Sequence, residues 1–278
     1  MKIPFIGGTI LLILFWMVGT MLFVMVGSAL ENPNARSAVI QIGMWLLPAL
    51  LYAHFFYDDF WGDLKLKKFG KPANRGWLIL LFLISMPMVG YLVAFNERIV
   101  FPEFLATLEQ WLREKEHSAK EATMARLSDM SSIDLISAML TMAVLPAICE
   151  EVFFRGVVLN NLIKRTSKIH LSVWLSAIIF SAVHLQFFGF FPRILMGAIL
   201  GYALVLSKSL WVPIILHFLN NGALILAYFF YQKEFIPENP LETNTAIPIW
   251  LAALSLIVGV TLLRFLFNRY NEVRSNSG

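Results

Sequence analysis

Two adjacent carboxylates and an arginine lie within a segment that otherwise has the composition of a membrane-spanning helix. The segment, residues 147–156 with the sequence AICEEVFFRG, holds Glu150, Glu151 and Arg155. A charged side chain at bilayer depth is costly, so it usually faces a protein interior or a watery cavity and serves a function. Glu151 and Arg155 are four residues apart and can pair on one helical face, while Glu150 points about 100° away. We therefore expect Glu151 to be neutralised by Arg155 and Glu150 to remain available for chemistry.

Two later apolar segments carry polar side chains at the same spacing. Phe180 and His184 are four residues apart, as are His217 and Asn221. Glu150 precedes Ser167, in a short basic loop, by as many residues as His184 follows it. If the loop joins two antiparallel helices, Glu150 and His184 reach a similar depth in the membrane.

This set of side chains is suited to hydrolysis of an acyl bond. A carboxylate in a cavity can act as a general base for water, histidines supply hydrogen bonds or metal ligation, and an amide can donate to an oxyanion. Cys149 could instead be a thiol nucleophile, but no neighbour in the sequence activates it and the next residues are negative. Simpler readings also exist: a packed histidine, an interhelical asparagine contact and a structural Glu151–Arg155 pair.

The composition is that of an integral membrane protein. Hydrophobic residues make up 58% of the 278 residues, charged residues only 14%, and the mean hydropathy is +0.71. The net charge of +4 fits the excess of Lys and Arg in cytoplasmic loops, and we expect no nucleic-acid partner. Membrane lipids are expected partners, a single cysteine excludes an internal disulfide, and no pattern indicates an oligomeric state.

The hydrophobic blocks predict an all-α fold, a polytopic transmembrane helical bundle of about eight spans in one domain, 1–278. The expected spans are residues 3–30, 37–57, 76–96, 135–162, 169–192, 194–207, 209–232 and 243–263. We expect the first to be a retained span because its apolar core is too long for a cleaved signal. The block 194–207 is short for a span. The motif-bearing catalytic core is expected at about residues 134–231.

The charged connections predict the orientation and one helix outside the membrane. Lys and Arg gather at residues 65–75 and in the C-terminal tail, so both termini are expected in the cytoplasm, at the cell membrane.

Within the polar stretch before the fourth span, Phe104, Leu108 and Trp111 recur at helical spacing after Pro102. We expect an amphipathic interfacial helix here, or alternatively a solvated cap over the bundle.

Three motifs together resemble the CPBP family of intramembrane proteases, which includes the type II CAAX prenyl endopeptidases and bacterial proteins linked to bacteriocin processing or self-immunity. The motifs are Glu150-Glu151-x-x-x-Arg155, Phe180-x-x-x-His184 and His217-x-x-x-Asn221. The resemblance implies that Glu150 activates water with help from His184, and that His217 and Asn221 stabilise the oxyanion. It also implies that Glu151 and Arg155 maintain the local architecture and that Phe180 lines the cavity.

The resemblance leaves the metal and the substrate open. Glu150, His184 and His217 could together bind Zn²⁺ with an open position for water, although no HExxH helix is present. We favour direct activation of water by Glu150 with no required cofactor. The implied substrate is a peptide or a lipidated protein. The sequence does not indicate whether it carries a prenyl group.

The alternative function is a non-proteolytic membrane protein that uses the carboxylate for binding or proton transfer. A bacteriocin immunity factor or a proton-linked transporter would be of this kind. The absence of an internal sequence repeat argues against a transporter.

Overall fold

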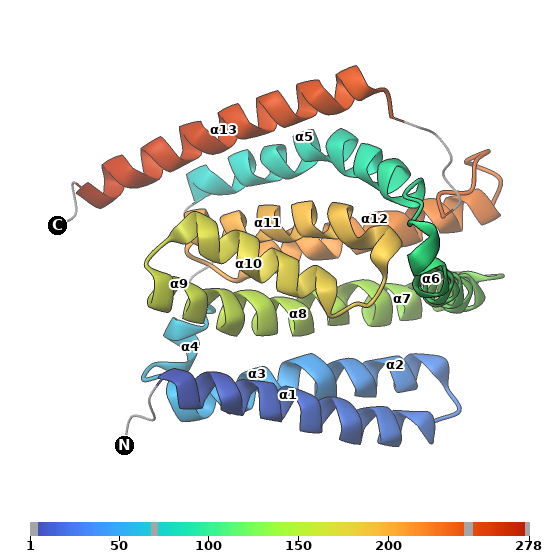
Figure 1. The fold of residues 1–278 in the computed structure, drawn as a ribbon, viewed down its shortest axis with the longest axis horizontal. Coiled ribbons are helices and arrows are strands. Elements are labelled where there is room, and N and C mark those ends of the chain that lie inside the picture. Colours follow the sequence, from blue (N-terminus) through green and yellow to red (C-terminus); the bar gives the residue numbers. More distant parts are fainter. Residues whose placement is uncertain (1–4, 68–71, 242–246, 276–278) are drawn as a thin grey trace. The chain divides into compact units, whose positions relative to one another are not determined.

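The computed structural model describes residues 5–67, 72–241 and 247–275, and these residues are helical with short connections and form no strand (Figure 1). The predicted all-α fold is therefore confirmed. The α-helices are α1 (Phe5–Ser28), α2 (Pro33–Gln41), α3 (Leu47–Phe56), α4 (Phe60–Asp63), α5 (Pro72–Glu97), α6 (Ala106–Leu127), α7 (Ser132–Ala138), α8 (Leu145–Glu151), α9 (Asn160–Thr166), α10 (Ile169–Ala182), α11 (Phe190–Ser207), α12 (Trp211–Gln232) and α13 (Ile249–Ser275).

The helices account for the predicted membrane spans. Within the described residues, seven helical segments are long and apolar enough to cross a bilayer, and α10 is a shorter apolar helix. The protein is thus a multi-pass membrane protein with about eight spans. Its orientation stays a prediction, and part of the evidence for it, Lys2, Lys68 and Lys71, lies outside the described residues.

The predicted boundary between the fifth and sixth spans is wrong. The block 169–192 is not one helix, because α10 ends at Ala182 and a turn with Leu185 at a φ of 54° follows. The next helix, α11, begins at Phe190, so the block 194–207 belongs to an 18-residue helix and α10, with 14 residues, is the short one. Pro192 lies in the first turn of α11, where its lack of an N–H removes no hydrogen bond within the helix.

Two other boundaries also differ from the hydropathy pattern. The last helix, α13, begins at Ile249 and continues past the expected end at residue 263 to Ser275, and the expected residues 243–246 lie outside the described residues.

The expected amphipathic helix is confirmed as α6, which follows a short 3₁₀ turn after Pro102. Phe104, Leu108 and Trp111 are exposed, and contact with the membrane surface stays a prediction.

The helices form two compact units. In the first unit, α1 packs against α2 and α3, and α8 packs against α12. In the second unit, α5 packs against α11 and α13, and α10 packs against α11. All members of the first and third motifs lie in the first unit, whereas Phe180 and His184 lie in the second. The expectation of one domain stays a prediction.

The two carboxylates lie on one continuous helix from Ser132 to Thr166 (Figure 1), and this helix contains two π-helical stretches. The π-helical stretches are Met139–Val144 and Val152–Leu159, so they flank α8 on both sides. π-Helical turns are rare and occur frequently at functional sites. The expectation that the helix continues through residues 147–156 is confirmed, although the π-helical turns were not expected.

Side chains from this irregular helix and from neighbouring segments bind its backbone carbonyls. The Tyr57 hydroxyl donates to the carbonyl of Gly156 at 2.8 Å, and Asn160 Nδ2 donates to the same oxygen at 2.9 Å. In the other π-helical stretch, Gln41 Nε2 donates to the carbonyl of Thr141 at 3.1 Å. These bonds stabilise a backbone that departs from regular α-helical hydrogen bonding.

Close backbone contact joins α1 to the π-helical stretch Ile42–Leu46 that follows α2. A Cβ atom added to Gly19 would clash with the carbonyl oxygen of Gly43 and would lie 3.2 Å from Cγ of Pro48. The first of these atoms is backbone and cannot rotate away. Small residues at such contacts are typical of packed membrane helices.

We therefore expect Gly19→Ala to destabilise the protein by about 1–3 kcal/mol through overpacking. The matched control is Gly76→Ala in α5, where an added Cβ meets no atom within 4 Å. The control should keep or slightly raise the unfolding midpoint, because alanine favours helix over glycine. Thermal and denaturant unfolding in detergent micelles measure both. Equal midpoints for the two variants would contradict close packing at Gly19.

Candidate active site

The expected ion pair between Glu151 and Arg155 is present and fully buried. Arg155 Nη1 donates to Glu151 Oε1 at 2.8 Å, and the two side chains are 1% and 0% exposed. The pair follows from the i, i+4 spacing on the continuous helix. Burial of either charge alone would cost several kcal/mol, so each requires the other.

A third group, His217 on α12, joins this pair. His217 Nδ1 lies 2.8 Å from Glu151 Oε1, the same oxygen that accepts from Arg155. Since a carboxylate accepts, Nδ1 carries a proton and donates it to Glu151. The ring of His217 is thereby fixed in orientation, and Nε2 is its other nitrogen. The spacing of the motifs gave no indication of this bond, which joins the first motif to the third.

Glu150 lies on the Nε2 side of the same histidine. Its Oε2 is 3.9 Å from His217 Nε2, and its side chain is 12% exposed. The two adjacent glutamates therefore approach opposite nitrogens of one imidazole. This arrangement agrees with the expected division of the pair, in which Glu151 has a structural contact and Glu150 points elsewhere. The catalytic role of Glu150 stays a prediction.

Asn221 is one turn after His217 and binds the irregular helix. Its Nδ2 lies 3.4 Å from the carbonyl of Met142, which is four residues before Pro146. Met142 lies in the π-helical stretch Met139–Val144, so this contact joins α12 to the irregular part of the helix. Asn221 thus has a structural contact, and its role at an oxyanion stays a prediction.

The second motif has its own internal geometry. His184 lies in the turn that follows α10, and its Nδ1 is 2.6 Å from the carbonyl oxygen of Phe180. The rings of Phe180 and His184 meet edge to face, with centroids 4.9 Å apart. A carbonyl only accepts, so Nδ1 donates and the neutral ring has its lone pair on Nε2. The predicted match in depth between His184 and Glu150 stays a prediction, because the two residues belong to different units.

Cys149 and the possible zinc ligands complete the predicted set. The Cys149 side chain is fully buried, which does not favour a reactive thiol. Within the described residues, no cluster of three or more His, Cys, Asp or Glu side chains has an arrangement that could hold a metal ion. The proposed ligands Glu150, His184 and His217 are divided between the two units, so the zinc hypothesis also stays a prediction.

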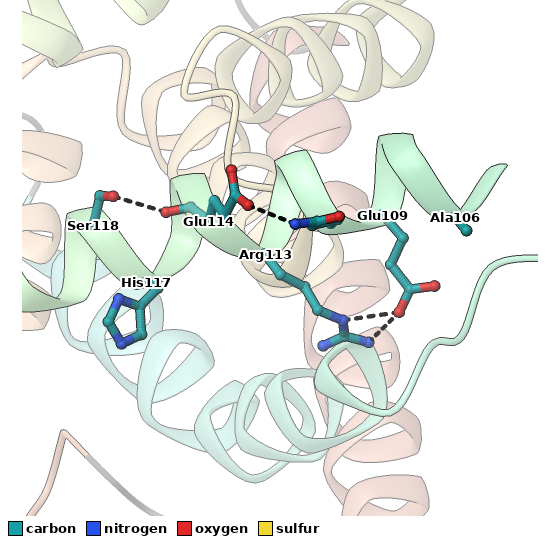
Figure 2. A pocket seen from close by; sticks show the side chains of 7 residues that line it. Ala106, Glu109, Arg113, Glu114, His117 and Ser118 are labelled. Carbon is teal, nitrogen blue, oxygen red and sulfur yellow. Dashed lines mark hydrogen bonds and ion pairs between the residues drawn. The ribbon is translucent and has the colours of Figure 1, made fainter.

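A separate hollow of about 550 Å³ lies along one face of α6 and contains none of the motif residues (Figure 2). Its charged and polar side chains pair along the helix: Arg113 Nε donates to Glu109 at 2.8 Å, and Gln110 donates to Glu114 at 3.0 Å. The backbone N–H of Phe101 and the Arg113 guanidinium lower the pKa of Glu109. These are ordinary i, i+4 pairs on an exposed helix face and do not indicate an active site.

Comparison with known families supports the resemblance seen in the motifs. Residues 132–223 match the family model described as "Type II CAAX prenyl endopeptidase Rce1-like". The match covers about a third of the chain and includes all seven motif residues. The predicted resemblance is thereby confirmed over this segment. No curated protein and no solved structure matches the chain.

We expect Arg155→Leu to destabilise the protein by about 3–5 kcal/mol, because it leaves the buried Glu151 carboxylate without its cation. Addition of Glu151→Gln should recover part of this loss, since it removes the uncompensated charge while keeping the side-chain shape. Lys67→Met is the control: it removes an exposed ion pair with Asp59 and should change the unfolding midpoint little. Unfolding in detergent measures all three, and a double variant no more stable than Arg155→Leu would contradict the buried pair.

Proposed function

We propose that this protein is an intramembrane endopeptidase in which Glu150 acts as the general base for water. The observation that carries the proposal is the position of Glu150, 3.9 Å from Nε2 of a histidine that Glu151 holds in place. This cluster lies in the segment that matches the type II CAAX prenyl endopeptidase family model. A partly buried carboxylate next to an oriented imidazole is a recurring arrangement for proton transfer in hydrolases.

The reaction follows from these groups. Glu150 accepts a proton from water as the water oxygen attacks the carbonyl carbon of the scissile peptide bond. The carbonyl oxygen then carries the negative charge of a tetrahedral intermediate. When the intermediate collapses, the C–N bond breaks and Glu150 returns the proton to the departing amine.

His217 is suited to stabilise the charge that develops in this reaction. In its imidazolium form it donates from both nitrogens, with Nδ1–H bound to Glu151 and Nε2–H on the side of Glu150, where an oxyanion would form. The formal charges of Glu150, Glu151, Arg155 and His217 then sum to zero, which reduces the cost of burying them. Asn221, one turn along α12, is the further donor that the family resemblance implies.

The resemblance further implies that His184 assists Glu150, and the geometry of its turn is compatible with this role. The Nδ1–H of His184 is held by the carbonyl of Phe180, so that the Nε2 lone pair is the atom able to accept a proton. The substrate class that the family name supplies is a prenylated CAAX-type C-terminus. The proposal also includes other membrane-associated peptides as substrates.

Zn²⁺ is the alternative cofactor, and the chemistry of the donors fits it. Both histidines place Nδ1 on an oxygen acceptor, which is the usual outer-shell arrangement of histidine ligands, and Glu150 supplies a carboxylate. Zn²⁺ held by Glu150, His184 and His217 would polarise the attacking water. We propose the metal-free reaction because the Glu150–His217–Glu151 arrangement supplies a base and a donor from the chain itself.

We expect Glu150→Gln to lower kcat about 10²- to 10⁴-fold, because the amide is isosteric but cannot accept the proton. The substrates are peptides that end in prenylated CAAX sequences and matched peptides without the prenyl group, with products identified by mass spectrometry. Cys149→Ser is the matched control at the adjacent position and should retain activity.

Three outcomes contradict parts of this proposal. If the wild type cleaves no peptide, a binding or proton-transfer protein such as an immunity factor or transporter is favoured. If Cys149→Ser is inactive, the thiol mechanism is favoured. If activity is lost on chelation and returns with Zn²⁺, the zinc mechanism replaces direct activation by Glu150.

A further inference from the structure

A single asparagine at the end of α5 binds both sides of the short helical turn that follows His184. Asn96 Nδ2 donates to the carbonyl of Phe187 at 2.8 Å, and Asn96 Oδ1 accepts from the N–H of Phe191 at 2.9 Å. Asn96 is completely buried, although its neighbours Phe95 and Glu97 are exposed. A buried amide with both ends bound to the backbone of another segment fixes that segment in place.

The turn after His184 requires such support because its backbone is strained. Leu185 has a φ of 54°, in the left-handed region that a leucine side chain disfavours by about 1–2 kcal/mol. Leu185 is also 61% exposed, so its own side chain contributes little packing to offset this strain. A strained residue persists only where surrounding contacts determine its conformation.

Other contacts of the turn include hydrogen bonds from the two helices that it joins. Arg193 on α11 donates to the carbonyl and the side chain of Gln186, at 3.3 Å and 2.9 Å. Ser181 on α10 donates to the carbonyl of Phe190 at 2.8 Å. Asn96 instead comes from α5, which packs against α11 in the same unit. Its two bonds therefore connect the turn to a third helix.

We propose that Asn96 is a positioning residue for His184. It fixes Phe187 and Phe191, so that the strained turn keeps the His184 ring against Phe180 with Nδ1–H on the carbonyl of that residue. This inference rests on the proposed function, in which His184 takes part in peptide hydrolysis. Asn96 touches neither the water nor the substrate in this scheme, and it acts through His184.

A double-mutant cycle separates positioning of His184 from general stability. We expect Asn96→Ala to lower kcat about 10- to 100-fold with little change in KM, because a small displacement of a reacting group is costly. In the His184→Ala background, the same substitution should cause no further loss. Equal losses in both backgrounds would overturn the proposal.

Ser255→Ala is the matched structural control. Ser255 is buried, lies in the same unit, and donates to the carbonyl of Ile84 on α5 at 2.6 Å. Its removal should change any residual activity by the same factor with and without His184. If Asn96→Ala does not yield folded protein, Asn96→Ser is used in the same cycle, because the hydroxyl retains one polar group at the site.

A second measurement tests the positioning without any catalytic activity. Nitrogen-15 NMR of the imidazole side chains, assigned with His184→Gln, should show a single Nδ1–H tautomer for His184 in the wild type and a tautomer mixture in Asn96→Ala. Unchanged His184 signals in Asn96→Ala would overturn the proposal. If Asn96→Ala shows this tautomer change but the wild type cleaves no peptide, the proposed function is refuted and the positioning of His184 is left intact.

Discussion

The structure depends on how one buried carboxylate is neutralised inside a membrane helix. Glu151 Oε1 accepts from both Arg155 and His217, while Oε2 is buried without a hydrogen-bond partner in the described part of the chain. Both donors thus meet at one atom, which couples a contact within the helix to a contact with α12. The cost of an uncompensated charge makes these groups interdependent, so the first and third motifs form one physical unit.

The neighbouring residues follow from the same constraint. The helix between Ser132 and Thr166 departs from α-helical geometry on both sides of α8, and side chains donate to carbonyls in each irregular stretch. Asn221 donates near the point where Pro146 removes a backbone donor. In a bilayer such carbonyls have no water to bind, so polar side chains that resemble catalytic groups in the sequence can also have structural roles.

The sequence predicted local relations well and distant ones poorly. The Glu151–Arg155 pair and the continuous helix follow from periodicity, which depends only on residues within a few turns. The turn after Ala182 was missed because no Asp, Glu, Lys or Arg interrupts residues 169–192, so the block was interpreted as one span. The bonds from Glu151 to His217 and from Asn96 to Phe187 join residues far apart in the chain, and no spacing rule reveals them.

The different environments of two adjacent glutamates are explained by helix phase. Consecutive residues on an α-helix point about 100° apart, so Glu151 can face Arg155 and His217 Nδ1 while Glu150 approaches the same ring from the Nε2 side. A π-helical turn contains an extra residue and rotates the helix face that follows it. The π-helical stretch before α8 therefore contributes to the direction in which both carboxylates face α12. An acidic pair in a regular helix of the same composition would keep its separation of about 100° but would have a different phase relative to α12, so spacing predicts the pair with Arg155 and does not predict the bond to His217.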